Sequence, residues 1–186
     1  MFFTLTSSYY TRRYVMKSDW RVYGKKADFE RLADKYSIDQ VIARIIRNRD
    51  ICGDSDIDMY LNGDIKDMHA PKDMKDAVVS VDIIEKKIKE KCRIRIIGDY
   101  DIDGICSIYI LYKGLLAAGA DVDYVVPHRI NDGYGINEHL IDNALSDGID
   151  TIITCDNGIS AYSQVKYAKD NGMTVIVTDH HDVPFD

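Results

Sequence analysis

The chain has 186 residues, of which 46% are hydrophobic and 30% are charged, and its formal net charge is −7. This composition is typical of a globular protein, and no apolar stretch approaches the roughly 20 residues that span a bilayer. The four cysteines form no C-x-x-C pair, which argues against a zinc ribbon or a thiol redox motif. The first residues lack a basic leader, so we expect a cytoplasmic protein without membrane contact.

Charge is unevenly distributed between the two halves of the chain. Residues 1–92 carry 18 Lys/Arg and 16 Asp/Glu, a net charge of +2, whereas residues 93–186 carry 6 and 15, a net charge of −9. Such an acidic half is the opposite of the basic surface that binds a nucleic-acid backbone. It is typical of a cation site whose ions are left out of the count.

The first half of the chain is predicted to be mainly helical. Residues 1–18 are expected to form a leader or extension, and residues 19–92 a helical N-terminal segment. Within that segment, apolar residues at helical spacing predict a capped helix from Ser37 and a second helix over residues 71–91. The acidic stretch of residues 52–64 is expected to be mostly loop, with room for one short helix.

Residues 93–186 alternate between short β-branched runs and helical patterns. The runs predict strands over residues 93–98, 122–127, 151–155 and 173–178, and the patterns predict helices over residues 104–118, 137–145 and 160–170. Strands that alternate with helices form parallel sheets through crossover connections. We therefore predict an α/β fold with a mainly parallel sheet flanked by helices.

Three of these predicted strands end in residues that could hold a metal ion. The carboxyl ends of parallel strands lie at one edge of a sheet, so these residues are expected to meet. Carboxylates with imidazoles favour Mn²⁺ over a site built for Mg²⁺ alone. Two such ions would activate water for phosphoester or phosphoanhydride hydrolysis. The acidic group after the first strand, taken alone, is also compatible with a surface turn. The residues are Asp99, Asp101 and Asp103 after the first strand, Asp156 after the third, and Asp179, His180 and His181 after the last.

The loop before residue 137 contains candidate contacts for a substrate. Arg129 could clamp a phosphate, and Gly133 and Gly135 could let the backbone approach a ligand closely. Tyr134 between them could stack on a base. A glycine turn with a tyrosine that faces the core is an equally compatible interpretation.

Three motifs in the second half resemble those of a known superfamily. Gly98-Asp-Tyr-Asp-Ile-Asp-Gly104, Asp156-Asn-Gly-Ile and Asp179-His-His181 resemble the first three motifs of the DHH phosphoesterases. Within that superfamily, the first motif and Pro127-His-Arg129 with Gly133-Tyr-Gly135 resemble the RecJ family of bacterial exonucleases. The resemblance covers about residues 19–186.

The resemblance implies a function and a role for each matched residue. It implies a Mn²⁺- or Mg²⁺-dependent 5′→3′ exonuclease that uses two ions on single-stranded DNA, in recombination and repair, with repair or replication proteins as candidate partners. The implied catalytic residues are the metal ligands Asp101, Asp103, Asp156 and His180, together with His181. Asp99 and Asp179 are implied as supporting carboxylates. The implied substrate contacts are Arg129, Gly133, Tyr134, Gly135, Asn157, Gly158 and His181.

Two departures from the superfamily pattern bear on the function. Ile97 stands where family II pyrophosphatases and many oligonucleotide-hydrolysing relatives carry a histidine, which argues against short oligonucleotides or cyclic dinucleotides as substrates. The chain also ends five residues after His181, before the fourth-motif aspartate, so we expect a DHH domain over residues 93–186 that is truncated and has weak or no activity alone. A RecJ-like scaffold without activity is the third alternative, although every visible ligand position is filled.

Overall fold

The computed structural model describes residues 24–184, which form two compact units that divide between Met68 and His69. The expected leader of residues 1–18 lies outside the described residues. Among those described, no helix has both the length and the apolar character needed to cross a membrane.

The first unit is a small helical core. Asp28 and Asp39 cap two of its helices by accepting hydrogen bonds from backbone N–H groups in the first turn. Its buried core is small, with four apolar side chains from the three helices. The helices are α1 (Phe29–Tyr36), α2 (Gln40–Asn48) and α3 (Asp54–Asn62), and the core residues are Leu32, Ala43, Ile46 and Ile57.

Two segments of the first ninety residues differ from the sequence-based expectation. Residues 52–64, expected to be mostly loop, contain the nine-residue helix α3, in which Ile57 is the buried residue. The single helix expected over residues 71–91 is instead a 3-10 turn, η2 (Pro71–Asp73), followed by α4 (Ala77–Lys89). The chain turns at Asp76, whose φ of 57° is not helical. A further 3-10 turn, η1 (Ile65–Asp67), precedes them.

The second unit contains a four-stranded sheet in which every neighbouring pair is parallel, as predicted from the sequence. The strand order is β2-β1-β3-β4. The central strands β1 and β3 are buried on both faces, which is why their sequences are nearly continuous β-branched runs. The strands are β1 (Arg93–Ile97), β2 (Asp121–Val125), β3 (Thr151–Cys155) and β4 (Thr174–Thr178).

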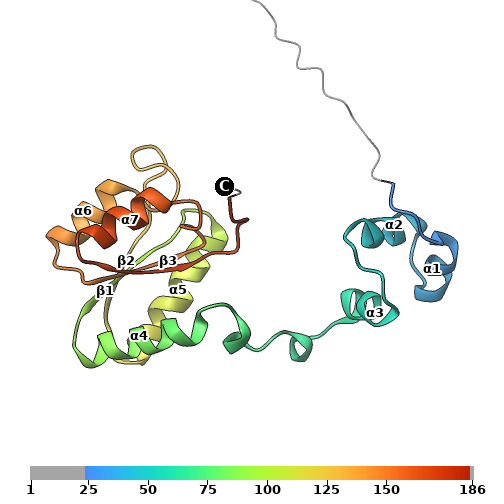
Figure 1. Cartoon of the computed structure of the whole chain (residues 1–186), viewed down its shortest axis with the longest axis horizontal. Coiled ribbons are helices and arrows are strands. Elements are labelled where there is room, and N and C mark those ends of the chain that lie inside the picture. Colours follow the sequence, from blue (N-terminus) through green and yellow to red (C-terminus); the bar gives the residue numbers. More distant parts are fainter. Residues whose placement is uncertain (1–23, 185–186) are drawn as a thin grey trace, which may run out of the picture. The chain divides into compact units, whose positions relative to one another are not determined.

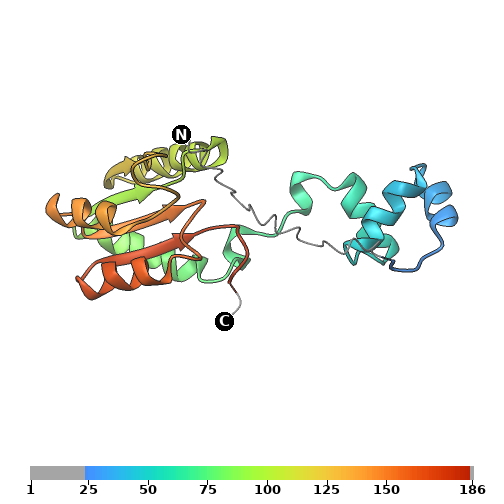
Figure 2. The same cartoon turned by 90° about the horizontal axis from the view of Figure 1, so that it is seen from above.

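Helices cover both faces of this sheet. Helices α4 and α5 (Ile102–Ala117) pack on one face, and α6 (Glu138–Ser146) and α7 (Tyr162–Asp170) pack on the other (Figures 1 and 2). Although α4 falls within the segment expected to be N-terminal, it belongs to the sheet unit because Ile83, Ile84 and Ile88 pack against the core.

The chain order reverses between the two central strands. From β1 the chain passes through α5 to β2 on one side, and from β3 it passes through α7 to β4 on the other. In open α/β sheets, ligands bind in the crevice at the carboxyl ends of the strands where the order reverses. The segments after β1 and β3 therefore border the expected binding crevice.

Candidate metal centre

The three aspartates after β1 occupy different environments. Asp101 caps α5, because its Oδ1 accepts a hydrogen bond from the backbone N–H of Gly104 at 3.0 Å. This bond, with a further contribution from Asp103, lowers the pKa of Asp101. Asp99 is only 2% exposed, and its buried Oδ1 has no hydrogen-bond partner among residues 24–184. The exposed Asp103, two residues after Asp101, offers a carboxylate oxygen within 4.8 Å of those of Asp101 and Asp156.

Helix α5 can begin this close to β1 only because residue 104 is glycine. A Cβ atom there would lie 2.6 Å from the carbonyl oxygen of Asp99 and 2.9 Å from its Cα. The close approach brings the first turn of α5, with Asp101 and Asp103, to the end of the central strand.

Asp156, directly after β3, is the most constrained carboxylate of the site. It is 8% exposed, its φ is 61°, and its N–H donates to the carbonyl of Thr178 at 3.1 Å. Burial, together with the negative charges of Asp103 and Asp101, raises the pKa of Asp156. A carboxylate in these surroundings is stabilised in its ionised form by a bound cation.

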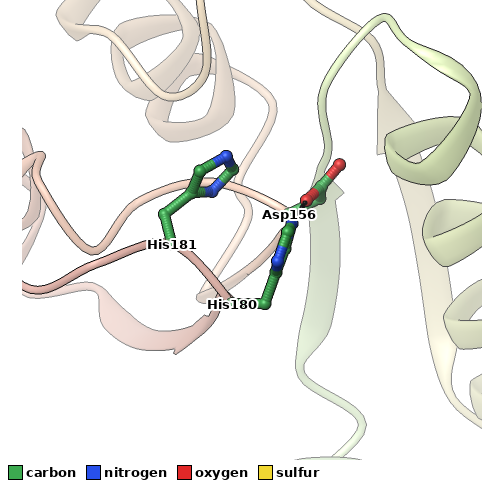
Figure 3. Close-up of side chains that lie close together, drawn as sticks. All are labelled: Asp156, His180 and His181. Carbon is green, nitrogen blue, oxygen red and sulfur yellow. Dashed lines mark ion pairs between the residues drawn. The ribbon is translucent and has the colours of Figure 1, made fainter. Parts of the chain in front are cut away.

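The two histidines follow β4 and have different partners. His180 Nε2 lies 2.9 Å from Asp156 Oδ1 (Figure 3). It also lies 4.0 Å from Asp103 Oδ2. His181 Nδ1 lies 2.6 Å from Asp179 Oδ1 instead. This hydrogen bond raises the pKa of His181.

Asp179 is a buried anchor for the second histidine. Its Oδ2 accepts a hydrogen bond from the Ile159 N–H at 3.0 Å, and its Oδ1 accepts one from the His181 N–H at 3.1 Å. Burial alone would raise the pKa of Asp179, but these hydrogen bonds outweigh it and lower the pKa. An ionised Asp179 thereby fixes the orientation of the His181 ring, as carboxylates do behind metal-site histidines.

The side chains from the three strand ends form two groups that share one member. Their candidate ligand atoms lie within 4.8 Å of one another in each group. The group from the ends of β1 and β3 offers only carboxylate oxygens, and the group from the ends of β3 and β4 offers one carboxylate and two imidazoles. Donors of these types suit divalent ions such as Mg²⁺ and Mn²⁺. The groups are Asp101, Asp103 and Asp156, and Asp156, His180 and His181.

An aromatic cluster borders the groups. The Tyr134 hydroxyl donates to the carbonyl oxygen of Asp156 at 2.9 Å, although the residue is 53% exposed. Burial of the hydroxyl end, followed by the charge of Asp99, raises the pKa of Tyr134 to about 12, so the hydroxyl keeps its proton at neutral pH. Tyr134 is therefore not the core-facing residue that one interpretation of the sequence allowed.

Tyr100 joins this cluster and was not singled out from the sequence. Its ring meets that of Tyr134 edge-on at a centroid distance of 6.5 Å. The guanidinium of the exposed Arg129 lies over Tyr100, 5.0 Å from the ring centroid. An aromatic residue inside the first motif, between Asp99 and Asp101, was the available signal.

Asn157, expected to contact the substrate, has a structural role instead. It is 1% exposed, and its amide NH₂ donates to the carbonyl oxygens of Ile97 and Cys155 at 3.0 and 2.9 Å. Its Oδ1 accepts a hydrogen bond from the Ile136 N–H at 3.1 Å. The side chain ties β3, β1 and the loop before α6 together, so it is not available to a ligand.

The glycines expected to contact the substrate shape the surrounding turns. Gly158 has a φ of 110°, and a Cβ atom there would lie 2.7 Å from Thr154 Oγ1. Gly135 packs against the Asn157 side chain, while Gly133 borders open space. A cavity of about 240 Å³ lies between this loop and the start of α7, bordered by Tyr134 and His181.

Comparison with known proteins agrees with this arrangement. Residues 93–186 match the DHH family, N-terminal domain. The chain belongs to the DHH family. The match begins at Arg93, the first residue of β1, and includes every side chain of the two candidate ligand groups.

Curated relatives of this DHH chain are named as exonucleases. It is 32% identical over 167 residues to the single-stranded-DNA-specific exonuclease RecJ of Bacillus subtilis. This match covers 89% of this chain and 21% of the relative. It is 43% identical over 103 residues to RecJ of Salmonella typhimurium, and this match covers 55% of this chain and 18% of the relative. The chain thus spans about a fifth of the length of these relatives.

Solved structures of RecJ share the fold. One, described as exonuclease RecJ bound to manganese, is 37% identical, with a TM-score of 0.54 over 58% of this chain and 28% of that chain. Another, RecJ of Thermus thermophilus in complex with Mn²⁺, is 28% identical, with a TM-score of 0.56 over 71% of this chain and 19% of that chain.

Proposed function

We propose that this DHH chain provides the metal-binding part of an exonuclease that hydrolyses single-stranded DNA from its 5′ end, in recombination and repair. The observation that carries the proposal is the meeting of three strand ends at one crevice, where two groups of ligand atoms share Asp156. The names of the RecJ relatives supply the substrate class and the reaction. The 5′→3′ direction comes from the family resemblance alone.

In this proposal the two groups hold two divalent ions, with Mn²⁺ preferred to Mg²⁺ because imidazole is among the donors. Asp101 and Asp103 would hold one ion and His180 the other, with Asp156 common to both groups of ligands. Such ions, when bound, neutralise phosphoryl charge and lower the pKa of water. His181 is assigned to the substrate phosphate, with its ring oriented by the contact of Nδ1 with Asp179.

The substrate side of the proposal uses the aromatic cluster. The Arg129 side chain is exposed and able to pair with a phosphate, while its guanidinium lies over the ring of Tyr100. The Gly133–Gly135 turn presents the ring of Tyr134 toward the same crevice. Asp99 and Asp179 act as supporting carboxylates. Repair or replication proteins as partners, and a cytoplasmic location, remain predictions.

The small-substrate alternative is less well supported. Ile97, where small-substrate relatives carry a histidine, is fully buried between β1 and the α6–α7 layer. The Ile97 side chain, which is apolar, offers no ligand atom for a metal ion. The inactive-scaffold alternative is disfavoured because the described ligand positions of the three motifs are all filled by donors that lie together.

The test is Mn²⁺-dependent release of nucleotides from 5′-labelled single-stranded DNA, with a blunt duplex and a dinucleotide as comparison substrates. We expect slow release from the single strand, and a loss of at least about 100-fold in Asp101→Ala because a ligand carboxylate is removed. Asp82→Ala, at an exposed position on α4, is the matched control and should retain the rate.

The other outcomes separate the alternatives. Hydrolysis of the dinucleotide alone would move the chain to the small-substrate branch. Binding of Mn²⁺ and DNA by the full-length gene product, with no hydrolysis of any substrate, would favour the scaffold. Release that is unchanged in Asp101→Ala would contradict the proposed site.

A further inference from the structure

The backbone of Asp156 is held in an unfavourable conformation from two sides. Its φ of 61° lies in the left-handed region, which side chains other than glycine seldom adopt. On one side, its N–H donates to the Thr178 carbonyl of β4 at 3.1 Å. On the other side, its carbonyl oxygen accepts the Tyr134 hydroxyl proton at 2.9 Å. Such conformations persist only where the surroundings fix them.

Tyr134 is well placed to fix this conformation. It comes from the loop before α6, 22 residues away in sequence, and its ring contacts Tyr100 edge-on at 6.5 Å and His181 edge-on at 6.0 Å. Its hydroxyl also lies 3.5 Å from both ring nitrogens of His181. The Tyr134 hydroxyl therefore contacts both the backbone of Asp156 and the ring of His181.

We propose that Tyr134 is a positioning residue. Its hydroxyl holds the backbone of Asp156 in the conformation that places the Asp156 carboxylate close to the other ligands of both groups. Because Asp156 belongs to both groups, a small rotation of its backbone would misalign both. This inference rests on the proposed function only in treating Asp156 as a metal ligand. The contact of the Tyr134 hydroxyl with the Asp156 backbone is itself a property of the protein without metal.

The test compares two tyrosine-to-phenylalanine variants that each remove one hydroxyl. Tyr134→Phe removes the bond to Asp156, whereas Tyr167→Phe removes a bond of similar length, 2.8 Å to Asp142 Oδ1, between α7 and α6. In metal-free protein, amide hydrogen exchange at Asp156 should be about fivefold faster in Tyr134→Phe than in wild type. Tyr167→Phe should leave it unchanged. Equal exchange rates at Asp156 in both variants would overturn the proposal.

A Mn²⁺ titration followed by electron paramagnetic resonance gives the second readout. We expect Tyr134→Phe to lower Mn²⁺ affinity by about tenfold, the effect typical of losing a group that supports a ligand. Tyr167→Phe should bind as wild type does. Unchanged affinity in Tyr134→Phe would overturn the positioning role. A wild-type chain that binds no Mn²⁺ would overturn the proposed function, and hydrogen exchange alone would then decide whether Tyr134 holds the backbone of Asp156.

Discussion

The pKa values of the carboxyl groups Asp101, after β1, and Asp156, after β3, are shifted in opposite directions. The Gly104 N–H lowers the pKa of Asp101, while burial and the charges of Asp103 and Asp101 raise the pKa of Asp156. A protein without metal therefore keeps negative charges close together at a cost to its stability. The cost falls most heavily on Asp156, which is buried and has a left-handed backbone.

Replacing this carboxylate should stabilise the metal-free protein. A carboxyl whose pKa is raised on folding destabilises the fold above that pKa, and the penalty disappears as the pH falls through it. Asn also tolerates the φ of 61°. We expect Asp156→Asn to raise the free energy of unfolding by about 1 kcal/mol at neutral pH in chelator. The gain should vanish below about pH 4, near the pKa of an unfolded aspartate.

Chemical denaturation between pH 3 and pH 8 measures this effect. Asp82→Asn, at an exposed position, is the control and should change little at any pH. A clear loss of stability in Asp156→Asn at neutral pH would show that the carboxylate is satisfied without a cation.

Individual side chains were predictable from the sequence where their position in a strand decides their place. Asp101, Asp156 and His180 follow strand ends, so a parallel sheet is enough to bring them together. Asn157 was misread as a substrate contact because its partners, including the carbonyl of Ile97 60 residues away, depend on which strands are neighbours. The bond from Tyr134 to Asp156 likewise depends on the path of a loop.

The start of helix α5 is the element on which the acidic group depends. Gly104 lies where the helix touches the end of β1, and a Cβ atom would meet backbone atoms of Asp99. Gly114 lies in the same helix, and a Cβ atom there would have no described residue within 4 Å beyond the neighbouring backbone of α5. The same glycine-to-alanine substitution can therefore be compared at a crowded position and at an open position of one helix.

We expect Gly104→Ala to lower the free energy of unfolding by about 1–3 kcal/mol, because the backbone of Asp99 must shift to admit a methyl group. Gly114→Ala should raise it by about 0.5–1 kcal/mol, since alanine favours a helix interior. Thermal and urea unfolding of both variants measures the contrast. Equal stability of Gly104→Ala and Gly114→Ala would contradict the inference that α5 approaches the end of β1 too closely to admit a side chain at residue 104.

Helix α4 is held to the sheet by a partly buried ion pair in addition to its apolar contacts. Lys87 Nζ lies 2.6 Å from Asp150 Oδ1, next to the start of β3. Burial alone would raise the pKa of Asp150, but the hydrogen bonds from Lys87 and Thr151, together with the charge of Lys87, outweigh it and the pKa is lowered. A carboxyl with a lowered folded pKa stabilises the protein above its unfolded pKa, and this stability is lost as the pH falls through the folded pKa.

Lys87→Met should therefore be less stable than wild type at pH 7 by up to about 1 kcal/mol. The difference should shrink as the pH falls below about 4. Lys86→Met removes an exposed lysine that is 3.9 Å from Glu90, and serves as the control with little effect. Urea unfolding at several pH values measures both, and a difference that stays constant from pH 7 to pH 2 would exclude Asp150 as its source.

The elements of the sheet unit were more predictable than those before it. Strands buried on both faces have dense β-branched runs, so the predicted strands lie within about two residues of those observed. Helix α3 has weak apolar periodicity, with Ile57 as its buried residue, and its acidic sequence resembles a loop. Pro71 and the left-handed Asp76 divide the segment that was expected to form one helix.

The described part of the chain consists of two units with separate cores. The core of the helical unit has four buried side chains, whereas the two cores of the sheet unit lie entirely between Ile83 and Ile176. Both candidate ligand groups belong to the sheet unit. Metal binding should therefore not depend on residues before His69.

We expect residues 69–186, expressed alone, to fold and to keep Mn²⁺ affinity within about twofold of the full chain, since every core contact of the sheet unit is retained. Calorimetry of the full chain should show a separate transition for the helical unit, because units with distinct cores need not unfold together. Circular dichroism and a Mn²⁺ titration of the shorter chain check this. An unfolded shorter chain would mean that the helical unit supports the sheet.

The most direct test of the account is a Mn²⁺ titration of the full chain and three variants, followed by electron paramagnetic resonance. The two ligand groups share Asp156, whereas Asp101 belongs to one and His180 to the other. We predict two bound ions in wild type, one weakened in Asp101→Ala, the other weakened in His180→Ala, and both weakened in Asp156→Asn. Two ions bound with wild-type affinity in Asp156→Asn would contradict the shared site.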